Sequence, residues 1–212
     1  MSSFQRCLLS IACFFPLLAN AEGVTIFSDV PEGIWYENAV AAFLDSQYLD
    51  STQGRFRGSE KALRGEFVKL VVELNGGILV DTPTVSHFSD VAPGDWFFPY
   101  FEEAAREGWV KGDQDCFPGK PCRVRPRESI TRAEAAAIIR RAFGKKPLGI
   151  APAFKDNPAG NWFSEFVQIA ADHCILQGDD ASRSVRPHDA LNRAEMVVML
   201  SRVDEGKRYP NC

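Results

Sequence analysis

The chain has 212 residues, of which 45% are hydrophobic and 25% are charged. These values are typical of soluble globular proteins and exclude long disorder, a collagen helix and a coiled coil. The net charge is −4, from 24 basic and 28 acidic residues, so the chain lacks the excess of positive charge that a general nucleic-acid binder needs.

The first 21 residues have the pattern of a secretory signal peptide. Arg6 precedes an apolar stretch over 8–18, and Ala-Asn-Ala at 19–21 forms a small-x-small cleavage site. The apolar stretch is far shorter than the ~20 residues that cross a bilayer, and no later stretch reaches that length. A lipoprotein signal with Cys13 as the modified residue is the alternative, but a serine stands where a lipobox prefers leucine. We therefore expect a secreted protein without membrane insertion, whose residues 1–21 are removed.

Three repeats follow the signal peptide, over 22–81, 82–147 and 148–212. Each repeat opens with a Phe-x-Asp motif, has a Trp eight residues after the Phe, and carries an Arg-small-Glu triplet further on. The repeat openings are 61 and 66 residues apart. The landmark residues are Asp29, Asp90 and Asp156 in the opening motif, Trp35, Trp96 and Trp162 after it, and Arg64, Arg132 and Arg193 in the triplet.

Each repeat predicts two amphipathic helices. The first begins at the Trp and has apolar residues at i, i+3, i+4, i+7 and i+8. The second begins at the triplet and has an apolar stripe at i, i+3, i+4 and i+7. In repeat 1 the two stripes are Tyr36, Ala39, Val40, Phe43 and Leu44, and then Phe67, Leu70, Val71 and Leu74.

The start of the second helix is marked by a capping box in two repeats. Thr131 with Glu134 forms it in repeat 2, and Asn192 with Glu195 forms it in repeat 3. Leu63 stands at the matching position in repeat 1 and has no polar side chain for a cap. We therefore expect that helix start to be weaker or shifted.

The fold class that follows is all-α. No alternation of apolar and polar residues is sustained anywhere, so no strand is predicted. A repeat of ~60 residues with two helices cannot bury both stripes alone, and we expect the three repeats to share one core.

Four cysteines follow the signal peptide, and an even number in an exported chain predicts two disulfides. We favour Cys116–Cys122, because a Pro-Gly turn at 118–119 can close the short loop, which leaves Cys174–Cys212. A four-cysteine zinc site is the alternative, but the spacing lacks the close Cys-x-x-Cys pairs that such sites prefer.

The motifs resemble the S-layer homology family. Ile-Thr-Arg-Ala-Glu at 130–134 matches its second-helix motif in full, 191–195 nearly so, and 62–66 keeps only the Arg and Glu. The resemblance covers about 27–205. It implies a pseudo-threefold trimer within one chain, with one helix of each repeat in a central three-helix bundle. It also implies grooves between repeats that bind secondary cell-wall polysaccharide, often pyruvylated, and hold exported proteins on the cell wall.

The landmark residues suit such a ligand. An Arg offers a fixed fork of donors for a carboxylate, a Trp offers a flat apolar face for a sugar ring, and an Asp accepts from hydroxyls. The structural alternative is that the Trp anchors the first helix and the Asp caps it. The candidate glycan-binding residues are Asp29, Trp35, Arg64, Asp90, Trp96, Arg132, Asp156, Trp162 and Arg193.

Repeat 1 departs from this pattern. Gln47 and Ser51 stand where repeat 2 has Gly108 and Gly112. If those glycines allow a ligand to approach the backbone, grooves that use repeat 1 bind more weakly.

No catalytic motif is present, and the three histidines fall at unrelated positions, so we expect no enzyme, cofactor or resident metal. Acidic residues at 113–115 and 179–180 lack the spacing of an EF-hand. The expected partner is an anionic cell-wall polysaccharide, with other S-layer or envelope proteins as further candidates. The alternatives are an envelope glycan-processing enzyme with paired carboxylates and a scaffold that binds protein segments in its grooves.

Overall fold

A computed structural model describes residues 27–77, 85–113, 122–179 and 182–204. The predicted signal peptide, Cys116 and Cys212 lie outside these residues. Within the described part of the chain the regular structure is helical, with only isolated bridges between extended residues, and the all-α expectation is confirmed. The elements are α1 (Glu37–Asp45), η1 (Ser51–Gln53), α2 (Arg64–Leu74), α3 (Phe98–Arg106), α4 (Arg132–Ala142), α5 (Ser164–Asp172) and α6 (Arg193–Asp204).

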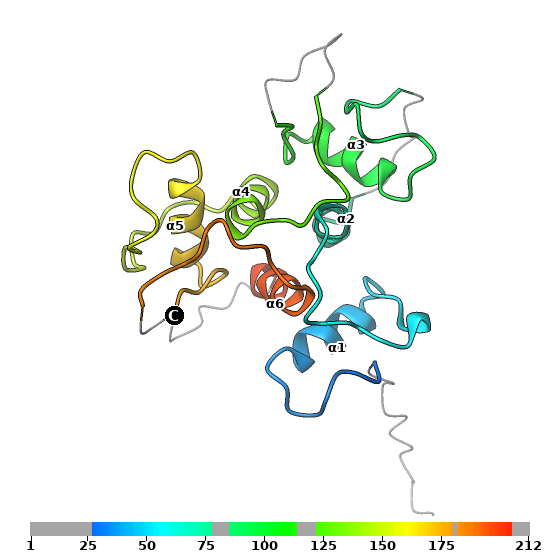
Figure 1. The fold of residues 1–212 in the computed structure, drawn as a ribbon, viewed down its shortest axis with the longest axis horizontal. Coiled ribbons are helices and arrows are strands. Elements are labelled where there is room, and N and C mark those ends of the chain that lie inside the picture. Colours follow the sequence, from blue (N-terminus) through cyan, green and yellow to red (C-terminus); the bar gives the residue numbers. More distant parts are fainter. Residues whose placement is uncertain (1–26, 78–84, 114–121, 180–181, 205–212) are drawn as a thin grey trace, which may run out of the picture.

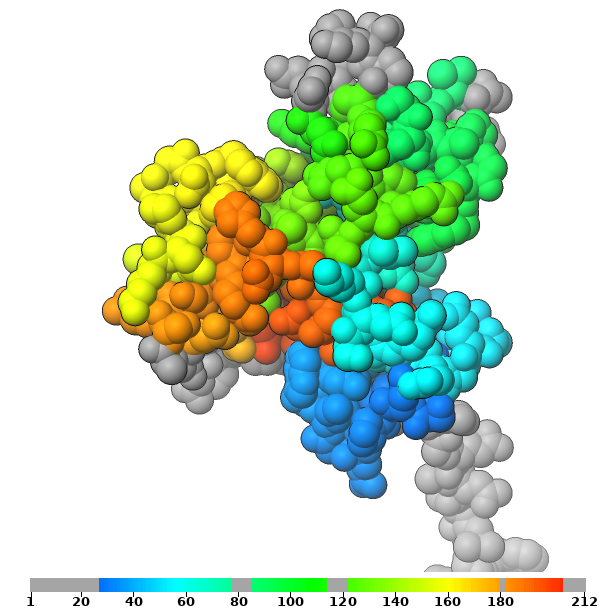
Figure 2. Space-filling model, in the orientation of Figure 1, coloured from blue at the N-terminus to red at the C-terminus, as the bar shows by residue number. Residues whose placement is uncertain are grey.

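The helices form two layers around a common centre. Helices α2, α4 and α6 meet in the middle, while α1, α3 and α5 lie outside them (Figure 1). Each outer helix with its loops forms a separate lobe of the surface (Figure 2). Each central helix packs on the outer helix of the next repeat, so that α2 contacts α3, α4 contacts α5, and α6 contacts α1. The repeats are therefore joined in a closed cycle.

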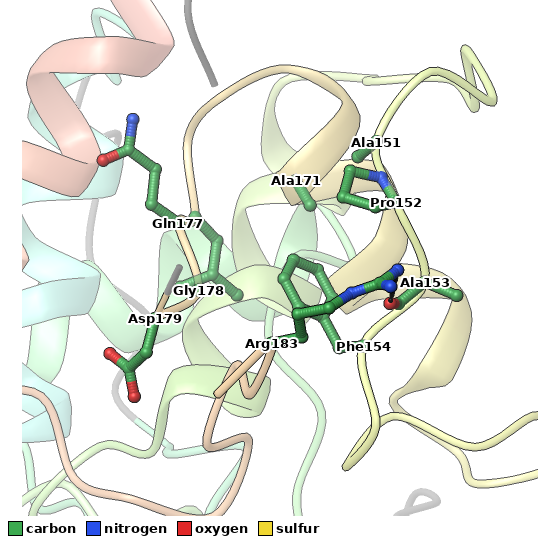
Figure 3. A pocket seen from close by; sticks show the side chains of 10 residues that line it. Ala151, Pro152, Ala153, Phe154, Ala171, Gln177, Gly178, Asp179 and Arg183 are labelled. Atoms are coloured by element: carbon green, nitrogen blue, oxygen red, sulfur yellow. Dashed lines mark hydrogen bonds between the residues drawn. The ribbon is translucent and has the colours of Figure 1, made fainter. Parts of the chain in front are cut away.

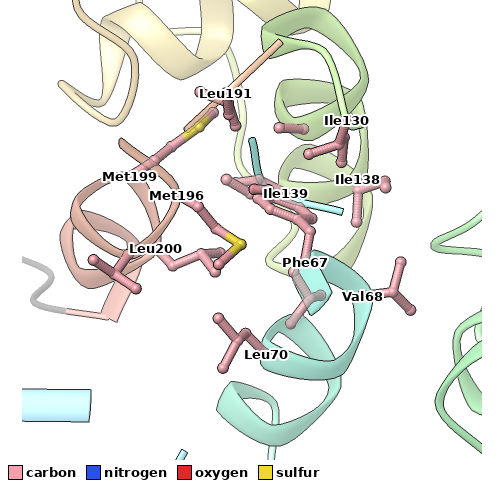
Figure 4. Packing of buried hydrophobic residues seen from close by; sticks show 14 of the residues in the cluster. Phe67, Val68, Leu70, Ile130, Ile138, Ile139, Leu191, Met196, Met199 and Leu200 are labelled. Atoms are coloured by element: carbon pink, nitrogen blue, oxygen red, sulfur yellow. The ribbon is translucent and has the colours of Figure 1, made fainter. Parts of the chain in front are cut away.

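The shared core consists of the predicted stripes. Phe67, Ile139 and Met196 come from the three central helices, are at most 1% exposed, and point into the space between them (Figure 4). The end positions Leu74 and Ala142 are only partly buried. A core shared by three repeats explains why neither stripe of a single repeat has to be covered within that repeat.

A ring of backbone hydrogen bonds joins the three repeats just before the central helices. The Ala62 N–H donates to the Leu191 carbonyl at 2.9 Å, and the Leu191 N–H donates to the Ile130 carbonyl at 2.9 Å. The Ile130 N–H closes the ring on the Ala62 carbonyl at 3.1 Å. All three residues are at most 1% exposed, so each of these buried polar groups is satisfied by a different repeat.

The first N–H groups of each central helix are likewise capped by the next repeat. In α2 the Arg64 N–H donates to Glu128 and the Gly65 N–H to Pro126, both at 2.9 Å. The α4 and α6 helices repeat this arrangement with carbonyls of repeats 3 and 1. These N–H groups have no partner inside their own helix, so their caps stabilise both the helix and the contact between repeats.

The sequence predicts a weaker or shifted start for the second helix of repeat 1, and the start is not shifted. Helix α2 begins at Arg64, the position equivalent to Arg132 in α4. Although Leu63 has no side-chain acceptor, the Glu66 carboxylate accepts from the Leu63 N–H at 2.9 Å. Half of the capping box, together with the carbonyls from repeat 2, is enough to fix the start.

The first helices begin two residues later than expected, at Glu37, Phe98 and Ser164 rather than at the Trp. In repeat 1 the segment before α1 forms a turn, in which the Glu37 N–H donates to the Ile34 carbonyl at 2.9 Å. The Trp therefore precedes the helix.

A left-handed residue ends each outer helix. Gln47, Gly108 and Cys174 follow the C-caps of α1, α3 and α5 with φ of 60°, 70° and 57°. Glycine is preferred at this position because other residues pay a steric cost. The difference between Gln47 and Gly108 that the sequence shows therefore concerns the helix end.

Replacing Gln47 with Gly should stabilise the protein. The left-handed conformation costs a residue with a Cβ about 1–2 kcal/mol, and the greater freedom of Gly in the unfolded chain offsets part of the gain. We expect the melting temperature to rise by about 2–4 °C, measured by circular dichroism. Gln47→Ala keeps the steric cost and serves as the control. A melting temperature of Gln47→Gly at or below that of Gln47→Ala would contradict this account.

Candidate functional site

The aspartates of the three Phe-x-Asp motifs hold the loops that lead to the central helices. In repeat 1 the Asp29 carboxylate accepts from the Phe56 N–H at 2.7 Å and from the Arg57 N–H at 2.8 Å. Asp90 and Asp156 accept in the same way from the equivalent residues of repeats 2 and 3. Burial opposes the ionisation of Asp29, but these N–H groups outweigh it and lower the pKa of Asp29.

Each of these loops contains one arginine that these bonds hold in the left-handed backbone conformation. Arg57, Arg125 and Arg186 have φ of 59°, 55° and 50°. Because each of them donates its N–H to the aspartate of its own repeat, the start of its side chain is fixed in position.

The triplet arginines cross from one repeat to the next. Nη1 of Arg64 lies 3.3 Å from the Glu134 carboxylate, and Nη1 of Arg132 lies 3.3 Å from that of Glu195. Arg193 closes this second ring by pairing with Glu66. Each glutamate is also the one that caps its own central helix, so one carboxylate serves both contacts.

Two of these three guanidiniums are deeply buried. Arg64 and Arg132 are 7% and 5% exposed, and burial lowers the pKa of both despite the opposing charges of Glu134 and Glu195. Arg132 donates from Nε to the Val185 carbonyl at 2.8 Å and from Nη2 to the Gln177 carbonyl at 2.7 Å. All three of its nitrogens therefore have a partner in repeat 3.

The tryptophans are exposed, unlike most large aromatic side chains. Trp35, Trp96 and Trp162 are 62%, 51% and 60% exposed. Each contacts the ring of the following aromatic residue nearly at right angles, with centroids 5.2–5.6 Å apart. The following residue takes the buried position, and an indole left open to solvent next to a groove is a candidate for ligand contact.

Two grooves combine these residues from different repeats. The groove of repeat 1 has a volume of about 360 Å³ and brings Arg193 of repeat 3 and Trp96 of repeat 2 to the walls of repeat 1. The groove of repeat 3 has a volume of about 190 Å³ and brings Arg132 of repeat 2 and Trp35 of repeat 1 to the walls of repeat 3. In both grooves the arginine comes from one neighbouring repeat and the tryptophan from the other.

The remaining candidate residues lie elsewhere. The three aspartates do not line either groove. Arg64 donates from Nη2 to the Lys111 carbonyl at 3.4 Å, and Trp162 lies against Phe166 with ring centroids 6.4 Å apart. Arg64 and Trp162 occupy the same positions within their repeats as Arg132 and Trp35 do within theirs.

A third cavity, of about 330 Å³, lies within repeat 3 (Figure 3). Phe154, Gly178 and Arg183 line it, and none of the candidate glycan-binding residues does. A Cβ on Gly178 would overlap the Phe154 ring and lie 2.9 Å from the Ser184 carbonyl oxygen. This glycine therefore accommodates an aromatic ring of its own repeat.

Sequence reasoning missed four cations that line the grooves, of which Arg55 and Arg186 lie on loops and two lie on central helices. Lys69 on α2 and Arg202 on α6 line the grooves of repeats 1 and 3. Both belong to the central helices that carry the buried stripes. The sequence signal that could have found them is a basic residue on a helix whose apolar stripe forms the core.

The described residues hold no cluster of three or more potential metal ligands. Cys122 and Cys174 lie in the described part of the chain, and neither is a free thiol. Their pairing with Cys116 and Cys212 stays a prediction. Among the described residues, no helix has the length and apolar character needed to cross a membrane.

These observations define a class of protein: an all-α repeat protein whose grooves lie between repeats and combine an exposed indole with a guanidinium. Comparison with known proteins gives the family. Residues 87–136 and 153–197 match the sequence model of the S-layer homology domain, and these two segments belong to that family. Repeat 1 lies outside the matched segments but has the same two-helix arrangement.

Relatives with named functions are much longer than this chain. The middle cell wall protein of Brevibacillus brevis is 30% identical over 69% of this chain and 12% of its own length. The cellulosome-anchoring protein of Acetivibrio thermocellus is 28% identical over 64% of this chain and 30% of its own length. An amylopullulanase of Thermoanaerobacterium thermosulfurigenes is 26% identical over 89% of this chain and 10% of its own length. The chain thus spans well under half of these relatives.

Removal of a triplet arginine should destabilise the fold. Arg132→Ala leaves the Glu195 carboxylate and two carbonyls without their partner, and breaking such a buried pair costs about 3–5 kcal/mol. Urea denaturation followed by circular dichroism measures this loss. Arg123→Ala, which removes the ion pairs of a 63% exposed side chain with Asp90 at 3.7 Å and Glu128 at 3.5 Å, should cost less than about 1 kcal/mol. Equal losses in the two variants would contradict the structural role of Arg132.

The stabilising effect of Asp29 should depend on pH. Because its pKa is lowered on folding, its contribution is present above the unfolded value of about 3.9 and is lost as the pH falls through the folded value. We expect Asp29→Asn to melt below the wild type at pH 7, and the gap to shrink below about pH 4. A gap that stays constant from pH 7 to pH 3 would show that the charge of Asp29 is unimportant.

Proposed function

We propose that the protein is a non-catalytic module that attaches to the cell envelope by binding an anionic, pyruvylated secondary cell-wall polysaccharide in its inter-repeat grooves. The observation that carries this proposal is the pairing in each groove of an exposed indole with a guanidinium from another repeat, Trp96 with Arg193 and Trp35 with Arg132.

The chemistry of this pair suits a charged sugar. An indole presents a flat apolar surface to the C–H face of a pyranose ring. A guanidinium favours a carboxylate, such as that of a pyruvate ketal, by charge and by its parallel N–H donors. In the groove of repeat 1, Arg193 donates from Nε to the Phe56 carbonyl at 2.8 Å and pairs with Glu66 through Nη1. Among the described residues its Nη2 has no hydrogen-bond partner, and this nitrogen is the donor for a ligand.

The candidate residues then divide by role. Trp35 and Trp96 contact the sugar, and Arg132 and Arg193 supply positive charge from a neighbouring repeat. Trp162 and Arg64 occupy the same positions of the repeat but line neither groove. Asp29, Asp90 and Asp156 act indirectly, because their carboxylates hold the loops beside the grooves in shape. The carboxylates in the described linings, those of Asp50, Glu66 and Glu195, each accept a backbone hydrogen bond, which favours binding over glycan hydrolysis.

The comparisons support attachment at the cell surface. The matched family is named for surface layers, and the relatives include a cell wall protein and an anchoring protein. Only 10% of the amylopullulanase is matched, so its name gives no reason to assign catalysis to this chain. A secreted protein held on the cell wall or S-layer, with other envelope proteins as neighbours, agrees with the predicted signal peptide.

Co-sedimentation with purified cell-wall sacculi tests the proposal. Trp35→Ala and Trp96→Ala should each weaken binding in their groove about 30-fold, since truncation of a central Trp in a binding site costs about 2 kcal/mol. Both side chains are exposed, so the helical spectrum should stay unchanged. Val85→Ala, an exposed aliphatic residue outside the grooves, is the control.

The sacculi themselves provide the second arm of this experiment. Removal of the polysaccharide, or of its pyruvate groups, should abolish retention of the wild type. If both treatments leave the retention unchanged, the glycan proposal is wrong.

A further inference from the structure

The groove of repeat 3 is rich in cations. Arg132, Arg186 and Arg202 line it, and the sole carboxylate in the described lining is that of Glu195. The groove has a volume of about 190 Å³, so these charges lie close to any ligand inside it. At such distances and partial burial, each excess charge strengthens the binding of an anion.

The groove of repeat 1 is more evenly charged. Arg55, Lys69 and Arg193 line it together with the carboxylates of Asp50 and Glu66. Its volume of about 360 Å³ is nearly twice that of the other groove. Compared with the groove of repeat 3, this groove offers an anionic group the same number of lining cations, but it has one more carboxylate and a larger volume.

Carboxylates outside the lining do not remove this difference. In repeat 3, Arg186 also pairs with Asp179 at 3.3 Å and with Asp189 at 3.7 Å. In repeat 1, Lys69 pairs with Glu73 at 2.9 Å, and Arg55 lies 3.7 Å from Asp29. These ion pairs add two carboxylates beside each groove, so the difference between the two linings stays the same.

Arg186 is the cation that can reach a ligand in the groove of repeat 3. Arg132 uses all three of its nitrogens on Val185, Gln177 and Glu195, and contributes mainly its charge. The Arg186 side chain is 44% exposed, and its backbone N–H is fixed by Asp156 at 2.7 Å. Arg202 also lines the groove, and its Nη2 donates to the Gln177 side chain at 3.2 Å.

The equivalent arginine of repeat 2 is held differently. Arg125 donates from Nη2 to Glu134 at 2.6 Å and from Nε to Asp113 at 2.7 Å. Burial opposes the charge of Arg125, but these two carboxylates outweigh it and raise its pKa. Among the described residues Arg186 makes no such bond to Glu195, the counterpart of Glu134, and its Nη2 has no hydrogen-bond partner.

We propose that the groove of repeat 3 is the preferred site for the ligand's carboxylate, which Arg186 binds directly, and that it fills before the groove of repeat 1. This inference rests on the proposed function and adds which groove, and which residue within it, select the charged group. The larger groove of repeat 1 binds the same polymer with lower affinity.

Each groove contains its own reporter, which makes the preference measurable. Trp35 lines the groove of repeat 3 and Trp96 that of repeat 1. Their indole N–H signals, assigned with Trp35→Phe and Trp96→Phe, can be followed by NMR in the full chain. The probe is the methyl glycoside of an N-acetylhexosamine that carries a 4,6-O-pyruvate ketal. We expect half-saturation of the Trp35 signal at a roughly five- to tenfold lower probe concentration than that of Trp96, about 1 kcal/mol.

Matched variants test the role of Arg186. Arg186→Gly removes the guanidinium, and glycine suits the φ of 50°, so the variant should fold. It should raise the half-saturation concentration of Trp35 about tenfold and leave that of Trp96 unchanged. Arg57→Gly is the control, because Arg57 has a φ of 59°, is 43% exposed and does not line the groove of repeat 1. It should leave both signals unchanged.

The outcomes separate the two proposals. If neither indole responds to the probe, the proposed function fails. If both respond but Trp96 saturates first or together with Trp35, the proposed function stands and the groove preference is overturned. If Arg186→Gly has no more effect on Trp35 than Arg57→Gly, the direct role of Arg186 is overturned.

Discussion

Every central helix of this protein needs a neighbouring repeat to complete its first turn. The N–H groups of Arg64 and Gly65 have no acceptor within α2 and find the carbonyls of Glu128 and Pro126 in repeat 2. The same dependence runs from repeat 2 to repeat 3 and from repeat 3 back to repeat 1. Because buried N–H groups without partners are costly, no repeat can form its second helix as well alone as in the cycle.

The same dependence builds the grooves. A triplet arginine that reaches the glutamate of the next repeat necessarily lies at the boundary between two repeats, as Arg132 does beside Glu195. The packing of α6 on α1 brings the segment with Trp35 to the other side of that boundary. Stability and ligand contact therefore draw on the same junctions, and a groove exists only where three repeats are correctly joined.

Much of the core could be predicted, because the spacing of apolar residues along one helix indicates which of them form a buried stripe. Phe67, Ile139 and Met196 are examples. The burial of Arg132 could not, since its acceptors Gln177 and Val185 lie 45 and 53 residues away and are backbone carbonyls of no particular side chain. The exposure of the tryptophans was hidden for a related reason. The adjacent aromatic residue takes the core position, and only three-dimensional packing decides between two neighbouring large rings.

The contact between α6 and α1 has a consequence for how the chain reaches its folded state. The outer helix that is synthesised first waits for the central helix that is synthesised last. Helix α1 therefore lacks its central-helix partner until α6 has been synthesised, whereas α3 and α5 follow directly after their partners α2 and α4. A chain of this topology can complete its cycle only after α6 has emerged, so the contact that closes the cycle is also the one between the most distant helices in the sequence.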